Sequence, residues 1–247
     1  MKAKVNGYGL TRLLPPPKGS GFPPTTSERI LFMKNQIFKI SEENAPLCGM
    51  TISTKSPISK TAAVTYFSLA AGTDISPESY PETQIYIVNA GEGDFSVGSD
   101  ASLRVCEGQM LIVPGGTLCG VSTEKGLVYT EVIPGKDVEM NNIIKAGEVF
   151  KIADKVPYKQ GSIVNLDVAS NENMKYVIMA FDEGTGLTPH SAPGDAIVFA
   201  LEGKAVIGYE GQDYKIQAGE QFRFDKGGVH SVTADGKFKM ALLLILK

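Results

Sequence analysis

The sequence predicts an all-β protein that contains two tandem copies of one folding unit. The duplication shows as a repeated offset of 112 residues, at which residues 37–40 (IFKI) are matched by residues 149–152 (VFKI). Gly91 corresponds to Gly203 at the same offset. Both copies consist of short segments rich in β-branched and aromatic residues, separated by turn residues. No long segment keeps the 3.6-residue period of a helix.

The predicted strands follow in the same order in each copy. The matched segments are 61–69 and 175–181, then 84–88 and 196–201, then the hairpin turns at 98–100 and 209–213. Gly108 corresponds to Gly219 at 111 residues, so the second copy has lost one residue in this hairpin. Many short strands, with no room for crossover helices, predict a sandwich or barrel closed by antiparallel pairing.

The repeat also predicts the domain boundaries. The first barrel is expected at residues 34–135, a linker at 136–146 and the second barrel at 147–247. Residues 1–33 are rich in proline and glycine, a composition that cannot pack a core, and we expect a disordered tail there. Strand-like sequence starts at Met33, and one hypothesis is that the natural protein begins there.

Composition excludes several kinds of partner. The net charge of -3 with 21% charged residues gives no basic field for nucleic acid or an anionic membrane. The three cysteines form no CxxC pair, and no signal peptide opens the chain, so we expect a cytoplasmic protein. The longest apolar run, residues 240–246, is far shorter than the roughly 20 residues of a membrane helix. Exposed barrel edges and this apolar last strand favour a homodimer, since unpaired edges tend to be covered.

The only two histidines of the chain occupy fixed points of the second copy. In order, these points are Gly184, His190, Gly203, Gly219, Gly227 and His230. The pattern resembles the two motifs of the cupin superfamily, G-x5-H-x-H-x3-4-E-x6-G and G-x5-P-x-G-x2-H. Because both copies share the register, the chain is similar to a bicupin. The resemblance implies two jelly-roll (double-stranded β-helix) barrels, in which three histidines and a glutamate hold a divalent metal.

The second copy keeps only part of that ligand set. His190 and His230 stand at the first and last histidine positions, whereas Ala192 and Ala196 replace the second histidine and the glutamate. Asp195 is a third candidate ligand. Neighbouring strand residues face opposite sides, so Asp195 would reach a metal only if the preceding turn shifts the register.

The other candidate residues line the expected pockets without forming a metal cage. Asp225 replaces the proline of the second motif and adds a carboxylate near the barrel mouth. In the first copy the four ligand positions hold Glu78, Tyr80, Gln84 and Cys119. This set is polar but contains no histidine, so we expect a structural barrel or a pocket without metal.

These observations lead to one functional hypothesis and one rival. The hypothesis is that the C-terminal barrel binds a small polar molecule, either directly or through one divalent ion (Fe, Mn, Ni or Zn) held by His190 and His230. The resemblance allows dioxygenation, isomerisation, decarboxylation or hydrolysis, and does not choose among them. The rival is a non-catalytic metabolite-binding or structural protein without metal, in which the histidines line an incidental pocket.

Overall fold

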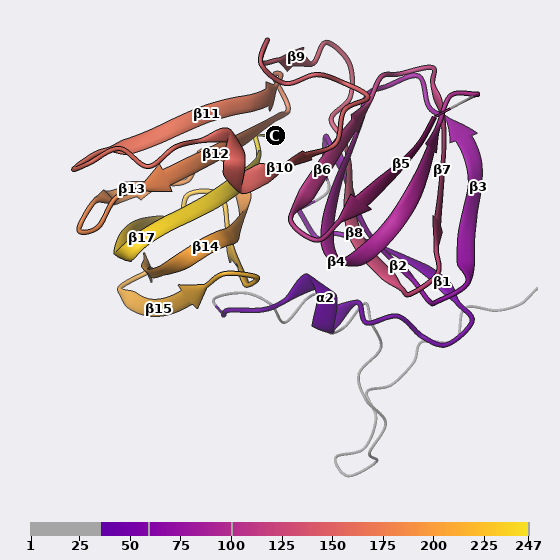
Figure 1. Ribbon diagram of the computed structural model, residues 1–247. Helices are drawn as coiled ribbons and strands as arrows, with labels where there is room; N and C mark the ends of the chain where they lie inside the picture. The colour runs from indigo at the N-terminus through magenta and orange to yellow at the C-terminus, as the bar shows by residue number, and fades with distance from the viewer. Residues whose placement is uncertain (1–35, 59, 100, 247) are drawn as a thin grey trace, which may run out of the picture.

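The computed structural model describes residues 36–58, 60–99 and 101–246, so the tail expected at residues 1–33 lies outside the described part. Two barrels lie side by side, the N-terminal one in purple and magenta and the C-terminal one in orange and yellow (Figure 1). Each is built from antiparallel strands, and the fold is the tandem jelly roll that the repeat predicts.

The N-terminal barrel is organised around one long strand, β4. Its strands are β1 (Thr51–Lys55), β2 (Ala63–Leu69), β3 (Thr73–Ser79), β4 (Gln84–Val97), β5 (Ala101–Cys106), β6 (Gln109–Val113), β7 (Leu118–Thr123) and β8 (Leu127–Ile133). The first half of β4 pairs with β6 and β8, and the second half pairs with β5 and β7. Strand β4 therefore belongs to both sides of the barrel.

The C-terminal barrel repeats this plan. Its strands are β11 (Ile163–Ser170), β12 (Met174–Phe181), β13 (Gly186–Ser191), β14 (Asp195–Tyr209), β15 (Gln212–Gln217), β16 (Gln221–Phe224) and β17 (Val229–Ile245). Strand β14 takes the place of β4: it pairs first with β16, then with β15, and with β17 along nearly its whole length. Because β17 also pairs with β12 and β13, it connects the two sides of this barrel.

The two repeats exchange their first segments. Phe38 forms a bridge with Gln221 of the C-terminal barrel, and Phe150 of β10 (Phe150–Lys151) pairs with Met110 of the N-terminal barrel. A short helix follows each of these contacts: α2 (Ile40–Glu43) in the first repeat and the 3-10 helix η1 (Ile152–Lys155) in the second. In the linker, β9 (Glu139–Met140) pairs with β11. The segment that opens each repeat thus lies on the other repeat's barrel.

A shared apolar core joins the barrels. Ile85 and Ile87 of β4 and Ile197 and Phe199 of β14 are buried in one cluster that contains residues of both repeats. Their alternate neighbours on the same strands face the interior of their own barrel. Both faces of these strand segments are therefore buried, which explains their nearly uninterrupted apolar sequence.

The last strand is internal rather than an edge. From Met240 to Leu244, β17 is paired on one side with β12 and on the other with β14. The side chains of this segment contribute to the cores of the same chain. The apolar last strand is therefore not an unpaired edge, and the homodimer stays a prediction without this support.

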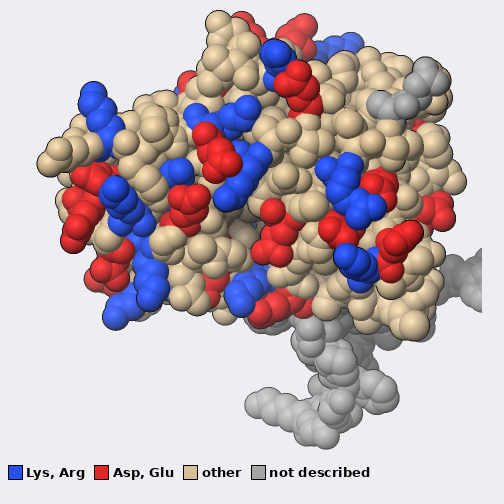
Figure 2. Space-filling model, in the orientation of Figure 1, with Lys and Arg blue, Asp and Glu red and all other residues tan. Residues whose placement is uncertain are grey.

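Charged side chains of both signs are mixed on the surface of the two barrels. Figure 2 shows lysine and arginine among aspartate and glutamate over this face, with no large area of one sign. Among the helices that the structure describes, none combines the length and the apolar character needed to cross a membrane.

Candidate functional site

The two histidines face each other across neighbouring strands. His190 of β13 is opposite His230 of β17 in the register, and their ring centroids are 4.2 Å apart. The Nδ1 atom of His190 lies 2.8 Å from the carbonyl of Thr188, and that of His230 lies 3.2 Å from the carbonyl of Gly228. A carbonyl can only accept, so each Nδ1 carries the proton, and in the neutral ring Nε2 is left as an acceptor.

The two rings differ in their exposure. His190 is exposed, whereas His230 is 7% exposed and stacks on Phe224 with ring centroids 4.0 Å apart. Burial lowers the pKa of His230 below 6.5; the Gly228 carbonyl opposes this shift and His190 adds to it. His230 is therefore a neutral imidazole at neutral pH.

The pKa of His230 predicts a loss of stability in mild acid. In the unfolded chain a histidine takes up its proton near pH 6.5, whereas folded His230 does so only at lower pH. The unfolded state therefore binds more protons in this range, and stability falls as pH falls through 6.5 towards the pKa of the folded state. Urea unfolding above and below pH 6.5 should show this loss in the wild type and a smaller one in His230→Gln. Equal pH dependence of the two proteins would contradict it.

A hollow lies at the end of the barrel that holds the pair. It has a volume of about 310 Å³ and is bordered by Pro189, Tyr209, Gln212, His230 and Ser231, among others. Ligand pockets commonly measure about 300–1,000 Å³, so the hollow is large enough for a small molecule. The site therefore combines two facing imidazoles with an open space that one of them, His230, borders.

The structure places Asp195 away from the histidines. Its carboxylate pairs with Lys60 of the N-terminal repeat at 2.8 Å and accepts a hydrogen bond from the Lys226 amide at 2.9 Å. Burial alone would raise the pKa of Asp195, but these two partners together hold it below its ordinary value. Ala196, by contrast, faces the inner core, so Asp195 lies on the outer side of β14.

The remaining residues predicted for the second barrel lie around its mouth and interior. Ala192 and Ala196 are buried in the inner core. Asp225 forms an ion pair with the buried Arg223 at 3.0 Å. None of the three adds a free ligand group to the histidine pair.

Comparison with known proteins identifies the fold. Residues 177–246 match the family model described as the cupin domain. The protein has the two-barrel cupin fold. A cupin 2 conserved barrel domain protein from Leptotrichia buccalis has a TM-score of 0.75 and 21% identity, over 86% of this chain and 97% of that one. No curated protein sequence matches the chain.

Two enzymes share this cupin architecture at lower similarity. Salicylate 1,2-dioxygenase from Pseudaminobacter salicylatoxidans has a TM-score of 0.61 and 13% identity, over 85% of this chain and 84% of its own. An oxalate decarboxylase variant from Bacillus subtilis has a TM-score of 0.52 and 14% identity, over 86% of this chain and 77% of its own. At these identities the similarity establishes the fold.

The side chains present do not fit the metal centre that the cupin resemblance implies. Within the described residues, no group of three or more His, Cys, Asp or Glu side chains could hold a metal ion. Protein sites for ions such as zinc normally use at least three protein ligands. Two neutral imidazoles also bring no negative charge to a dication, and Asp195 and Asp225 are already paired with basic groups.

The structure brings together the polar set predicted in the first cupin barrel. Glu78 of β3 is opposite Cys119 of β7, which matches the pairing of the two histidines in the other barrel. The Tyr80 hydroxyl donates to Glu78 at 2.8 Å, which raises the pKa of Tyr80 to about 12. Gln84 is buried and donates to Glu131 at 3.3 Å.

Sequence reasoning missed Glu131. This residue belongs to no motif and lies on β8, whose sequence LVYTEVI otherwise indicates an ordinary buried strand. Its inward direction follows only from its pairing with Tyr86 of β4. The one available signal was a carboxylate in an otherwise uncharged strand.

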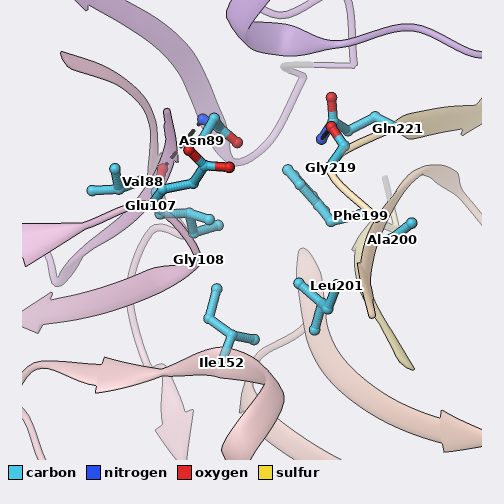
Figure 3. Close-up of a pocket in the computed structure, with 11 residues that line it drawn as sticks. Val88, Asn89, Glu107, Gly108, Ile152, Phe199, Ala200, Leu201, Gly219 and Gln221 are labelled. Carbon is cyan, nitrogen blue, oxygen red and sulfur yellow. Dashed lines mark hydrogen bonds between the residues drawn. The ribbon is translucent and has the colours of Figure 1, made fainter. Parts of the chain in front are cut away.

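A second cavity lies between the barrels. Figure 3 shows Asn89 and Glu107 on one side of it and Phe199, Leu201 and Gln221 on the other. Its volume is about 90 Å³, well below the usual range of ligand pockets. We therefore regard the hollow beside His230 as the better candidate for ligand binding.

Proposed function

We propose that the C-terminal barrel binds a small polar molecule at the rim where His190 and His230 meet. The observation that carries this proposal is the facing pair of imidazoles, 4.2 Å apart, of which His230 borders a hollow of about 310 Å³. Each ring uses its Nδ1 proton on a backbone carbonyl, so each offers Nε2 as an acceptor. A ligand that carries hydroxyl or N–H donors fits these atoms best.

The packing of the barrel favours a rim site over a deep one. The interior below the histidines is filled by aromatic side chains, including Phe181, Phe222 and Phe238, each of which is fully buried. Small barrels are commonly filled in this way and leave no central cavity. The rim is the part of this barrel where an imidazole, His190, is exposed to solvent.

The structural neighbours favour a small organic compound as the ligand. Salicylate and oxalate appear in the names of two enzymes with this architecture. Because the described side chains form no metal centre, we propose binding by the imidazoles themselves. A divalent ion held by the two histidines and completed by oxygens of the ligand is the other form of the hypothesis, and the same experiment separates the two.

A thermal-shift screen of small hydroxylated and carboxylated compounds tests the proposal. Compounds that stabilise the wild type should bind the double variant His190→Ala, His230→Ala at least about tenfold more weakly, because one or two hydrogen bonds are lost. Lys215→Ala, on an exposed position of β15, is the matched control and should bind as the wild type does.

Two further outcomes decide between the forms of the hypothesis. Screening is repeated after reconstitution with iron, manganese, nickel and zinc, and the metal content is measured by elemental analysis. Stoichiometric metal that disappears in the double variant would assign the site to metal-held binding. Compounds that bind the wild type and the double variant equally would refute a ligand site at the histidines.

A further inference from the structure

The N-terminal barrel contains a buried carboxyl group that points into its interior. Glu131 of β8 is opposite Tyr86 of β4, whose side chain lies in the inner core, and neighbours on paired strands share a face. Only 9% of the residue is exposed. This carboxyl group and the histidine pair lie in different barrels, so a role for Glu131 is independent of the function proposed for the C-terminal barrel.

Glu131 differs from the other buried charged residues in its partners. Among the described residues, the buried Asp, Lys and Arg side chains all have an ion-pair partner: Asp195 pairs with Lys60 at 2.8 Å, Arg223 with Asp225 at 3.0 Å and Lys239 with Glu202 at 3.3 Å. Glu131 has only neutral donors, the Gln84 amide at 3.3 Å and the Tyr86 hydroxyl. A buried carboxylate without a cation is unfavourable, so free Glu131 keeps its proton to higher pH, and no ion pair with a described residue would stabilise its ionised form.

The fold itself does not require this carboxyl group. The duplication places Ala196 at the position of Gln84 and Leu242 at the position of Glu131, since Tyr86 pairs with Glu131 as Val198 pairs with Leu242. Leu242 packs against the inner core of the C-terminal barrel. The same architecture is therefore built with two apolar side chains where the first barrel keeps an amide and an acid.

The charges of the groups around Glu131 favour a positively charged ligand. The titratable groups that act on it or share its side of the barrel are Glu78 on β3, Tyr86 on β4, Cys119 on β7 and Tyr129 on β8, and Tyr80 lies next to Glu78. None of these groups is basic. One basic residue, Lys55 of β1, lies on the same face of the sheet, but it is exposed and is separated from Glu131 by Thr65 of β2. Glu78 is exposed at the rim, and its charge acts on the buried acid. An anion would be repelled here, whereas a cation would be attracted by both carboxylates.

An organic ammonium group fits this site better than a metal ion. The described residues contain no group of three His, Cys, Asp or Glu side chains that could hold a metal. An ammonium group needs only hydrogen-bond acceptors for its three protons, and aromatic faces attract it as well. The carboxylates of Glu131 and Glu78 supply such acceptors, and the buried rings of Tyr86 and Tyr129 lie in the same inner core.

We propose that the N-terminal barrel binds a small organic ammonium compound, with Glu131 as its buried counter-ion and Glu78 as the carboxylate at the entrance.

Binding should release a proton. Burial raises the pKa of Glu131, the hydrogen bonds from Gln84 and Tyr86 oppose this shift, and Glu78 adds to it. The free site therefore holds a protonated acid over a wider pH range than an exposed glutamate does, and a bound ammonium favours the ionised form. Affinity should rise about tenfold per pH unit while free Glu131 is protonated, and should level off above its pKa.

The experiment uses propylammonium chloride as the probe on the full chain, with 1-propanol as the neutral isostere and sodium chloride at equal ionic strength. Calorimetric titration should give a dissociation constant on the order of 1 mM for propylammonium and no measurable binding of propanol. Titration in two buffers with different ionisation enthalpies measures the released proton. Glu131→Gln should abolish both signals, and Glu124→Gln, an exposed position of the same barrel, should change neither.

Three results would overturn the proposal. Propylammonium that binds no better than propanol would remove the case for a cation site. Unchanged binding by Glu131→Gln would place the ligand elsewhere. Binding of manganese or calcium in place of propylammonium, lost in Glu131→Gln, would make the site a metal site. Because Glu131→Gln removes a buried acid, it should remain folded, which circular dichroism and its melting temperature check directly.

Discussion

Replacing Gly203 by alanine should lower the free energy of unfolding by at least about 3 kcal/mol. Gly203 lies where β14 passes from one side of the barrel to the other, and its φ of +74° is in the left-handed region that favours glycine. A Cβ atom at this position would also collide with the backbone carbonyl oxygen of Lys237 on β17. Since Asp235 and Lys239, on either side of Lys237, are both paired with β14, this carbonyl cannot move away cheaply.

A second glycine makes it possible to measure the cost of backbone strain without the cost of a steric collision. Gly211 has a similar φ of +80°, but a Cβ atom added there meets nothing within 4 Å. Gly211→Ala should therefore cost only the conformational strain, about 1–2 kcal/mol. Urea unfolding of both variants measures the difference. If Gly203→Ala were no more destabilising than Gly211→Ala, the close approach of β14 and β17 would not be the reason for this glycine.

Gly203 also explains why the fold could be predicted from the sequence. Gly91 holds the equivalent position on β4, where its Cβ would collide with the carbonyl oxygen of Gly126. A backbone position that tolerates only glycine recurs in both repeats, and so the 112-residue spacing was visible. The exchange of Phe38 and Phe150 between barrels was not predictable, because it depends on long-range pairing that leaves no local pattern.

Some residues of the candidate sites could be predicted from the sequence, and others could not. His190 and His230 could be selected because they stand at fixed points of a motif, and the structure brings them together. For Asp195, strand alternation already indicated the wrong face, and the structure adds the partner, Lys60, from the other repeat. Glu131 could not be found, because its significance depends on which groups surround it in the packed barrel, and none of the described ones is a cation.

Glu131→Gln should stabilise the protein at neutral pH by roughly 1–2 kcal/mol. Burial is the main cause of the raised pKa of Glu131, so ionising this group in the free protein costs folding free energy. The amide of glutamine keeps the shape and can still accept from Gln84, but it carries no charge. Melting temperature and urea unfolding of the two proteins check the gain.

The stability gained in Glu131→Gln should depend on pH. A carboxyl group whose folded pKa is raised binds its proton more tightly in the folded state, so stability of the wild type rises as pH falls through the folded pKa towards 4.5. The advantage of Glu131→Gln should therefore be largest above the folded pKa and should shrink in acid. An advantage that is the same at every pH would mean that the charge of Glu131 is not its cause.

The equivalent residues of the C-terminal barrel suggest a second variant, which tests whether the Glu131–Gln84 pair stabilises the first barrel. Glu131→Leu alone leaves the buried amide of Gln84 without its acceptor, which costs about 1–3 kcal/mol. The double change Gln84→Ala, Glu131→Leu copies the residues Ala196 and Leu242 of the other barrel and removes both polar groups together. If the double variant is at least as stable as the wild type, the first barrel keeps its acid at a cost in stability, as binding sites often do. If it is much less stable, Glu131 and Gln84 hold the barrel together, and their presence needs no ligand to explain it.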